Sequence, residues 1–148
     1  MEYKSRSLDE FNAEAARFAR ELLPRAGAAT VVALSGDLGA GKTTFVQQMA
    51  REFGVDEQVN SPTFVIEKIY ECSQGPYVRL VHFDAYRLKD MHELDVLGWN
   101  EIVADPGNLI LLEWPEHVVG AVPKDAIRIT LSGADDERTI QYYYDGEK

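Results

Sequence analysis

The sequence is short of cysteine and of long apolar runs, and each shortage excludes a class of protein. Cys72 is the only cysteine, so an internal disulfide and a thiolate metal cluster are both excluded. No apolar stretch approaches the roughly 18 residues that a membrane-spanning helix needs. The first residues, Met1–Arg6, lack the apolar core of a secretory signal. We therefore expect a cytoplasmic protein that makes no contact with a membrane.

Positive charge is also scarce. Lysine and arginine together number 15 against 25 aspartates and glutamates, which gives a formal net charge of −10 at pH 7. Binding driven by the nucleic-acid backbone needs clustered lysines and arginines that displace counterions. Direct, tight binding of RNA or DNA by this chain alone is therefore not expected. The acidic balance suits either a basic partner or simply a well-solvated exterior.

A complete G-x-x-x-x-G-K-[ST] pattern is the most informative feature present, and it runs from Gly36 to Thr43. An apolar β-type run, Thr30–Leu34, enters this loop, and a helix-like segment leaves it. The glycines allow backbone N–H groups to point at phosphate oxygens, and the new helix adds its positive N-terminal end. Lys42 can reach the β- and γ-phosphates, and Thr43 can ligate Mg²⁺. The pattern predicts a nucleoside triphosphate site. A guanine-specifying Asn-Lys-x-Asp run is absent, so adenine is the base left by elimination.

Length and periodicity predict the architecture around this loop. The chain has 148 residues, 45% of them hydrophobic, which fits one domain over residues 1–148 with one central core. Ser7 and Glu10 have the form of a capping box. Apolar residues at helical spacing follow them. The expected helices are residues 7–23, 43–53 and 90–98.

The predicted strands complete an α/β fold. Leu109–Leu112 is a continuous apolar run, typical of a strand buried on both faces. Residues 64–70 and 77–83 predict one hairpin, and residues 126–131 and 138–144, turning at 133–136, predict another. We expect a central mixed sheet that is parallel around the phosphate loop, extended by antiparallel hairpins and flanked by helices.

Two acidic residues stand at the ends of predicted strands. Glu113 follows Leu109–Leu112, and Asp84 follows Val81–Phe83. A triphosphatase needs an acidic residue to hold the metal through water or to orient the attacking water. A carboxylate that ends a buried strand is costly unless a metal or a cation accompanies it. Both residues are candidates, and the spacing allows the two to exchange roles. Asp84 can instead cap a turn or pair with Arg87.

A possible switch segment, Ser61-Pro62-Thr63-Phe64, lies about twenty residues after Lys42, just before a predicted strand. A hydroxyl in such a segment can be offered to Mg²⁺ or to the γ-phosphate. The alternative is a Ser-Pro turn that enters the strand. The histidines have no metal-ligand spacing, so we interpret His82, His92 and His117 as structural. Trp114 is compatible with the core, with nucleotide contact or with a partner surface.

Four motifs, taken in order, closely resemble the bacterial TsaE family, the ATPase component of tRNA threonylcarbamoyladenosine biosynthesis. The two less specific motifs are the loop at residues 36–44 and Ser61–Phe64. The two that are specific to the family are His82-Phe83-Asp84-Ala85-Tyr86-Arg87-Leu88 and Glu113-Trp114-Pro115-Glu116. Together they span more than half of the chain. One departure is at Phe11 and Asn12, near the start of the first helix, where family members often carry a threonine.

The resemblance implies a weak ATPase that uses ATP and Mg²⁺ and works with the transferase TsaD and its partner TsaB. That pair modifies adenosine 37 of tRNA, so tRNA would meet this chain only indirectly. The implied catalytic residues are Lys42, Asp84 and Glu113, with Thr43 and Glu113 on the metal. The implied nucleotide-binding residues are Asp37, Leu38, Gly39, Ala40, Gly41, Lys42, Thr43 and Thr44, with Ser61 and Thr63 as switch-like residues.

Two other functions stay open beside this one. A small-molecule kinase would transfer phosphate to an acceptor other than water, although the chain has no lid-length insertion. A nucleotide-gated binding module without useful turnover would associate with partners in the presence of ATP even after loss of Glu113 or Asp84.

Overall fold

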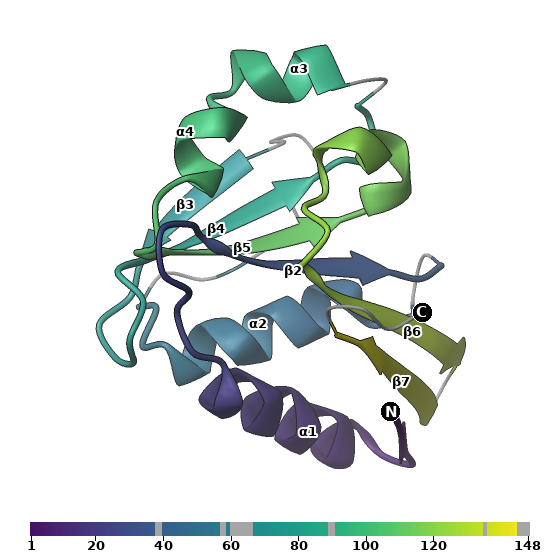
Figure 1. The fold of residues 1–148 in the computed structure, drawn as a ribbon. Coiled ribbons are helices and arrows are strands. Elements are labelled where there is room, and N and C mark those ends of the chain that lie inside the picture. The colour runs from purple at the N-terminus through teal and green to yellow at the C-terminus, as the bar shows by residue number, and fades with distance from the viewer. Residues whose placement is uncertain (38–39, 57–58, 60–66, 89–90, 135, 145–148) are drawn as a thin grey trace.

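The computed structural model describes residues 1–37, 40–56, 59, 67–88, 91–134 and 136–144. The strands form a seven-stranded sheet in the order β1-β7-β6-β2-β5-β4-β3 (Figure 1). Its strands are β1 (Glu2–Ser5), β2 (Thr30–Ser35), β3 (Glu67–Glu71), β4 (Arg79–Asp84), β5 (Asn108–Glu113), β6 (Ile127–Ala134) and β7 (Glu137–Tyr143). The helices are α1 (Leu8–Glu21), α2 (Lys42–Glu52), α3 (Met91–Val96), α4 (Trp99–Val103) and the 3₁₀ segment η1 (Pro115–Ala121).

The centre of the sheet is parallel and both of its edges are antiparallel. Strand β2 lies between β5 and β6 and runs parallel to both, and β4 runs parallel to β5. Strands β3, β7 and β1 add to the edges in antiparallel pairs. Every residue of β5 is buried, as expected for a strand with a layer on each face. The mixed sheet predicted from the sequence is therefore confirmed.

Two layers of helix cover the sheet (Figure 1). Helices α1 and α2 lie on one face, and α3, α4 and η1 lie on the other. The first face buries Phe18 and Phe45 against Leu111, and the second buries Leu94 and Trp99 against strand residues. Helices thus cover both faces of the parallel strands with apolar side chains. Polar side chains can therefore gather at the ends of these strands.

A buried carboxylate fastens α1 to the sheet. Ser7 caps the helix by accepting the Glu10 N–H at 3.1 Å, as the sequence predicted, and Glu10 accepts the Arg6 N–H at 2.8 Å. Farther along α1, Glu14 is 4% exposed. Arg17 Nε donates to its Oε1 at 2.7 Å, and the Tyr142 hydroxyl of β7 donates to its Oε2 at 2.5 Å. Burial opposes the charge, yet these hydrogen bonds lower the pKa of Glu14 below its usual value.

The short and peripheral elements differ from the prediction. Strand β1, helix α4 and η1 were not expected, because each is too short to show a period of its own or depends on a distant partner. The helix predicted over 90–98 corresponds to α3, which ends at Val96, and Gly98, with a φ of +85°, separates it from the unexpected α4. The final turn is tighter than predicted, because Ala134 still pairs with Glu137. Residues 64–66 of the predicted strand lie outside the described residues. No helix in the described ranges is long and apolar enough to cross a membrane.

Candidate functional site

The phosphate-loop pattern joins the central strand β2 to α2. Gly36 has a φ of +150°, and a Cβ there would lie 2.5 Å from the backbone oxygen of Leu131 on β6. Gly41 has a φ of +106°, and a Cβ there would lie 3.0 Å from the ring of Phe11. Both positions therefore require glycine, for the backbone angle and for the close approach of a neighbour. Leu38 and Gly39 lie outside the described residues.

The first turn of α2 begins at this loop without a side-chain cap. Gly41 is the N-cap residue and supplies no side-chain hydrogen bond. The N–H groups at a helix start, together with the helix dipole, favour an anion there. Within the loop, the Ala40 N–H donates to the carbonyl of Asp37 at 3.0 Å, so this amide is engaged inside the loop. The geometry suits an anion at the start of α2.

Lys42 is turned back onto its own loop. Its side chain is 6% exposed, and Nζ donates to the carbonyl of Gly36 and, at 3.1 Å, to that of Asp37. Burial lowers the pKa of Lys42 below its usual value, and nearby carboxylates, Glu113 first, oppose that shift. The amine is thus a buried cation whose acceptors are loop carbonyls, which phosphate oxygens could replace.

The two candidate carboxylates lie side by side at the edge of the sheet that carries the loop. Asp84 ends β4 and Glu113 ends β5, and the register pairs them directly. Glu113 also pairs with Leu34 of β2, just before the loop. The strands are parallel, so their carboxyl ends share one edge, where ligands of α/β sheets bind. Sequence spacing could not assign separate roles to Asp84 and Glu113, because both residues end strands at the same edge of the sheet.

Their surroundings differ. Glu113 is 3% exposed and its Oε2 lies 2.5 Å from His82 Nε2. Asp84 is partly exposed, and its Oδ1 accepts the Tyr86 N–H at 2.9 Å, so the turn-capping alternative is present. Burial raises the pKa of Asp84 above its usual value, and the charge of Glu113 adds to that rise, while the Tyr86 N–H and the charge of Lys42 oppose it.

His82, which the sequence analysis interprets as structural, is a fully buried imidazole that contacts Glu113, a contact the sequence analysis did not predict. Alternation along a strand offered a signal, because His82 and Asp84 are two residues apart and their side chains share a face. The contact itself depends on the pairing of β4 with β5, which spacing does not reveal. His117 instead lies 2.9 Å, through Nδ1, from the carbonyl oxygen of Ala85.

Trp114 joins the site through Lys42. Its ring centroid lies 4.3 Å from Lys42 Nζ, and its ring also packs against Tyr86 and His117. Among the described residues it is the non-glycine residue with a positive φ, at +59°. Such a conformation costs on the order of 1–3 kcal/mol and persists where the surroundings enforce it, often at functional sites. Trp114 also packs against the core on this face of the sheet, so the core alternative is seen in part, while contact with a nucleotide or a partner stays a prediction.

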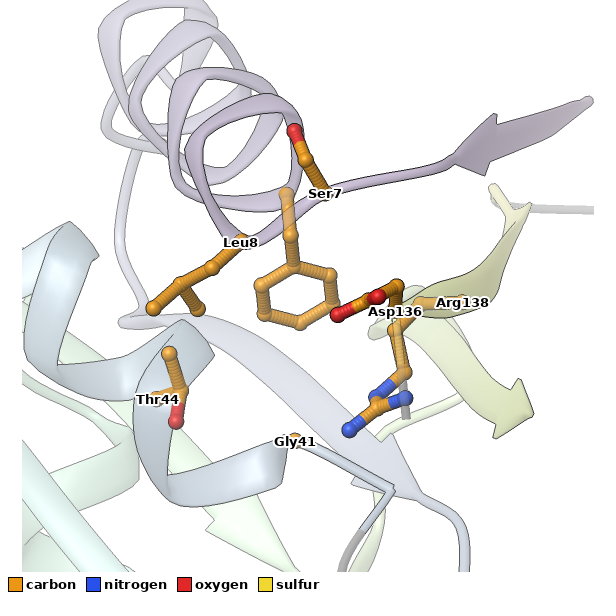
Figure 2. Close-up of a pocket in the computed structure, with 7 residues that line it drawn as sticks. Ser7, Leu8, Gly41, Thr44, Asp136 and Arg138 are labelled. Carbon is orange, nitrogen blue, oxygen red and sulfur yellow. The ribbon is translucent and has the colours of Figure 1, made fainter. Parts of the chain in front are cut away.

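A pocket opens beside the start of α2. It lies between the first turn of α1, the first turn of α2 and the β6–β7 turn (Figure 2), and is lined by Ser7, Leu8, Phe11, Gly41, Thr44, Asp136 and Arg138. In Figure 2 the guanidinium of Arg138 extends from β7 toward Gly41. The pocket thus continues the loop on the side of Thr44. Phe11 forms part of its wall.

The donor set suits Mg²⁺ bound together with phosphates. Within the described ranges, no group of three or more His, Cys, Asp or Glu side chains could hold a metal by itself. Mg²⁺ at nucleotide sites commonly takes only one or two protein oxygens and completes its shell with phosphate and water. Thr43, in the first turn of α2, and Glu113, at the adjacent strand end, offer oxygens of this kind. Ser61 and Thr63 lie outside the described residues.

A glycine-rich loop between the central parallel strand and a helix, on a sheet of this order, defines a P-loop α/β protein. The family model described as threonylcarbamoyl adenosine biosynthesis protein TsaE matches residues 9–140. The chain belongs to this family, and with it to tRNA threonylcarbamoyladenosine biosynthesis.

Individual relatives agree. The tRNA threonylcarbamoyladenosine biosynthesis protein TsaE of Bacillus subtilis is 41% identical over 113 residues, which cover 76% of this chain and 68% of the relative. The protein of that name from Rickettsia prowazekii is 36% identical over 124 residues, 83% of this chain and 80% of the relative. The crystal structure of Bacillus subtilis YdiB superposes with a TM-score of 0.74 at 29% identity, covering 99% of this chain and 86% of that one.

Proposed function

We propose that the chain binds and hydrolyses ATP as a component of the tRNA threonylcarbamoyladenosine machinery, acting with TsaD and TsaB. The observation that carries the proposal is the shared sheet edge, where the loop lysine and two carboxylates converge. Lys42 lies at the start of α2, while Asp84 and Glu113 end the neighbouring strands. Family membership identifies the biosynthetic process, and the residues at this edge of the sheet are the basis for the proposed ATP hydrolysis.

Each residue has a role that its position supports. The backbone of the loop, Asp37–Lys42, together with Thr43 and Thr44, would hold the phosphates. Lys42 would exchange its loop carbonyls for β- and γ-phosphate oxygens and neutralise their charge. Thr43 and Glu113 would hold Mg²⁺, which supplies charge stabilisation at the phosphates when bound. Asp84, partly exposed, would accept a hydrogen bond from the attacking water.

The nucleoside end of ATP would occupy the pocket of Figure 2. That pocket adjoins Gly41 and Thr44, so a nucleotide whose phosphates lie in the loop can extend into it without leaving the protein surface. Leu8 and Phe11 give it an apolar side and Arg138 a polar one. Such a mixed lining suits a base and a sugar.

The proposed partners rest on the family, and the net charge of the chain agrees with them. A net charge of −10 does not favour direct contact with tRNA, so TsaD and TsaB would carry the tRNA. We propose that the protein acts in the cytoplasm and that residues 1–148 form one functional domain.

The test is phosphate release from ATP and Mg²⁺ by the purified chain, alone and with TsaD and TsaB. We expect slow release alone, faster release with both partners, and a loss of about 100-fold or more in Lys42→Ala. Modification of tRNA should fall in parallel. Lys124→Ala, an exposed lysine, is the matched control and should behave as wild type.

The alternatives give different results. Equal phosphate release by Lys42→Ala and wild type would remove the proposed role of the loop. A rate indifferent to TsaD and TsaB, together with labelled phosphate on a small molecule, would establish the kinase.

Because burial lowers the pKa of Lys42, folding disfavours its charged form, so Lys42→Met should not lower the thermal midpoint at neutral pH.

A further inference from the structure

Glu113 is held by the imidazole of His82. Its Oε2 lies 2.5 Å from His82 Nε2, and both side chains are buried. Among the described residues, no lysine or arginine lies within ion-pair distance of Glu113. A buried carboxylate left without a donor is costly, so the hydrogen bond to His82 contributes directly to keeping this side chain inside.

The other imidazole nitrogen indicates where the proton lies. His82 Nδ1 is buried and has no hydrogen-bond partner in the described part of the chain. A buried N–H without an acceptor is rarer and costlier than a buried lone pair without a donor. The arrangement therefore favours the tautomer with its proton on Nε2, which donates to Glu113 Oε2.

We infer that His82 is a positioning residue that fixes the Glu113 carboxylate at the phosphate loop through this Nε2–H···Oε2 hydrogen bond. The bond occupies one carboxylate oxygen and leaves Oε1 for water or Mg²⁺. The inference rests on the proposed ATP- and Mg²⁺-dependent function of the same edge.

The backbone makes His82 a rigid support. His82 lies in the middle of β4, paired with Lys68 of β3 on one side and with Leu111 of β5 on the other. Glu113 is the last residue of β5, two positions after Leu111. The side chain of His82, in the interior of the sheet, thus orients the side chain of Glu113 at the end of its strand.

Two variants separate hydrogen bonding from packing. His82→Gln keeps a side-chain N–H near the position of Nε2, and His82→Leu fills similar space without a donor. The first readout is the affinity of a fluorescent ATP analogue, measured without Mg²⁺ and across a Mg²⁺ titration. The second is kcat and KM for phosphate release with TsaD and TsaB present. Thermal unfolding of each variant is recorded alongside.

We expect His82→Leu to weaken the Mg²⁺ dependence of nucleotide binding by about 10- to 100-fold and to lower kcat by a similar factor. Nucleotide affinity without Mg²⁺ and KM should stay near wild type, and His82→Gln should recover most of both losses. A folded His82→Leu with wild-type Mg²⁺ dependence would overturn the inference. So would a folded His82→Gln as defective as His82→Leu.

A measurement on the unaltered protein covers the case in which His82→Leu does not fold. The imidazole ¹⁵N signals of His82 in the metal-free chain should show Nε2 protonated and Nδ1 unprotonated, and a proton on Nδ1 would contradict the inference. This readout needs no ATP hydrolysis. If the wild-type chain hydrolysed no ATP under any condition, the proposed function would fail, while the tautomer and the Mg²⁺ titration would still report on His82 itself.

Discussion

Two glutamates, one on α1 and one at the end of β5, are almost equally hidden from solvent and are treated differently by the fold. Glu14 is 4% exposed and Glu113 is 3% exposed. Arg17 and the Tyr142 hydroxyl both donate to Glu14, and Arg17 also supplies an opposite charge. Glu113 receives one imidazole. Burial alone therefore does not distinguish a carboxylate bonded into the fold from one for which we propose a role at the phosphate loop.

The partners make the distinction. Around Glu14 both oxygens are bonded and the charge is cancelled, so this residue fastens α1 to β7 and has no capacity left for a ligand. Around Glu113 one oxygen contacts the His82 imidazole, and the nearby Lys42 is bonded to carbonyls of the phosphate loop. The first arrangement stabilises the fold, and for the second we propose a role toward a metal or water.

The largest effect is expected from Glu113→Gln. Replacing the carboxylate by an amide should lower phosphate release by about 100-fold, the size of effect seen when one group that stabilises a transition state is lost. The free energy of unfolding should change little, because an amide still accepts a hydrogen bond from His82. Turnover with partners and urea unfolding of the same preparation give both numbers. A large loss of stability with normal turnover would place Glu113 in the same class as Glu14.

The opposite pattern is expected from Glu14→Gln. Losing charged hydrogen bonds in a buried site should cost about 1.5–3 kcal/mol of unfolding free energy, while phosphate release at a temperature where the variant is folded should match wild type. Urea denaturation followed by circular dichroism measures the loss. If turnover fell by as much as in Glu113→Gln, the contrast between the two glutamates would be wrong.

Tyr142→Phe should have a smaller effect of the same kind. It removes one donor to Glu14, at 2.5 Å, and leaves the Arg17 contacts in place. We expect a loss of about 1 kcal/mol in unfolding free energy. Tyr143→Phe is the matched control, because the Tyr143 hydroxyl makes only a 3.4 Å contact with Gln141. Equal stability of the two variants would show that the Tyr142 hydroxyl contributes nothing.

The smallest expected effect is a difference in pH dependence. Because the pKa of Glu14 is lowered in the folded chain, its carboxylate stabilises the fold above its unfolded-state pKa, near 4.5, and this stabilisation is lost as pH falls through the folded-state value. The stability gap between wild type and Glu14→Gln should therefore be constant near neutral pH and narrow below about pH 4.5. Urea midpoints across an acid series test this, and a gap that widens in acid would reverse the assigned direction.

The strongly patterned parts of the chain were predictable. The loop at residues 36–44, helix α2 and the buried strand β5 each carry a local signal, whether glycine spacing, helical spacing or an unbroken apolar run. The capping of α1 by Ser7 was readable for the same reason. Strand β1 was not, because it exists through its pairing with β7 at the other end of the chain. Helix α4 was not, because five residues show no clear period.

Within the candidate site, the sequence by itself determined which groups are present: a phosphate-loop pattern, a lysine, and carboxylates at strand ends. These follow from residue types at short fixed spacings, which fix local backbone geometry. Tertiary structure alone decided that Asp84 and Glu113 would be neighbours, that His82 would hold Glu113, and that Lys42 would rest against Trp114. Those contacts depend on the order and register of parallel strands, which long crossover connections set and which no local spacing encodes.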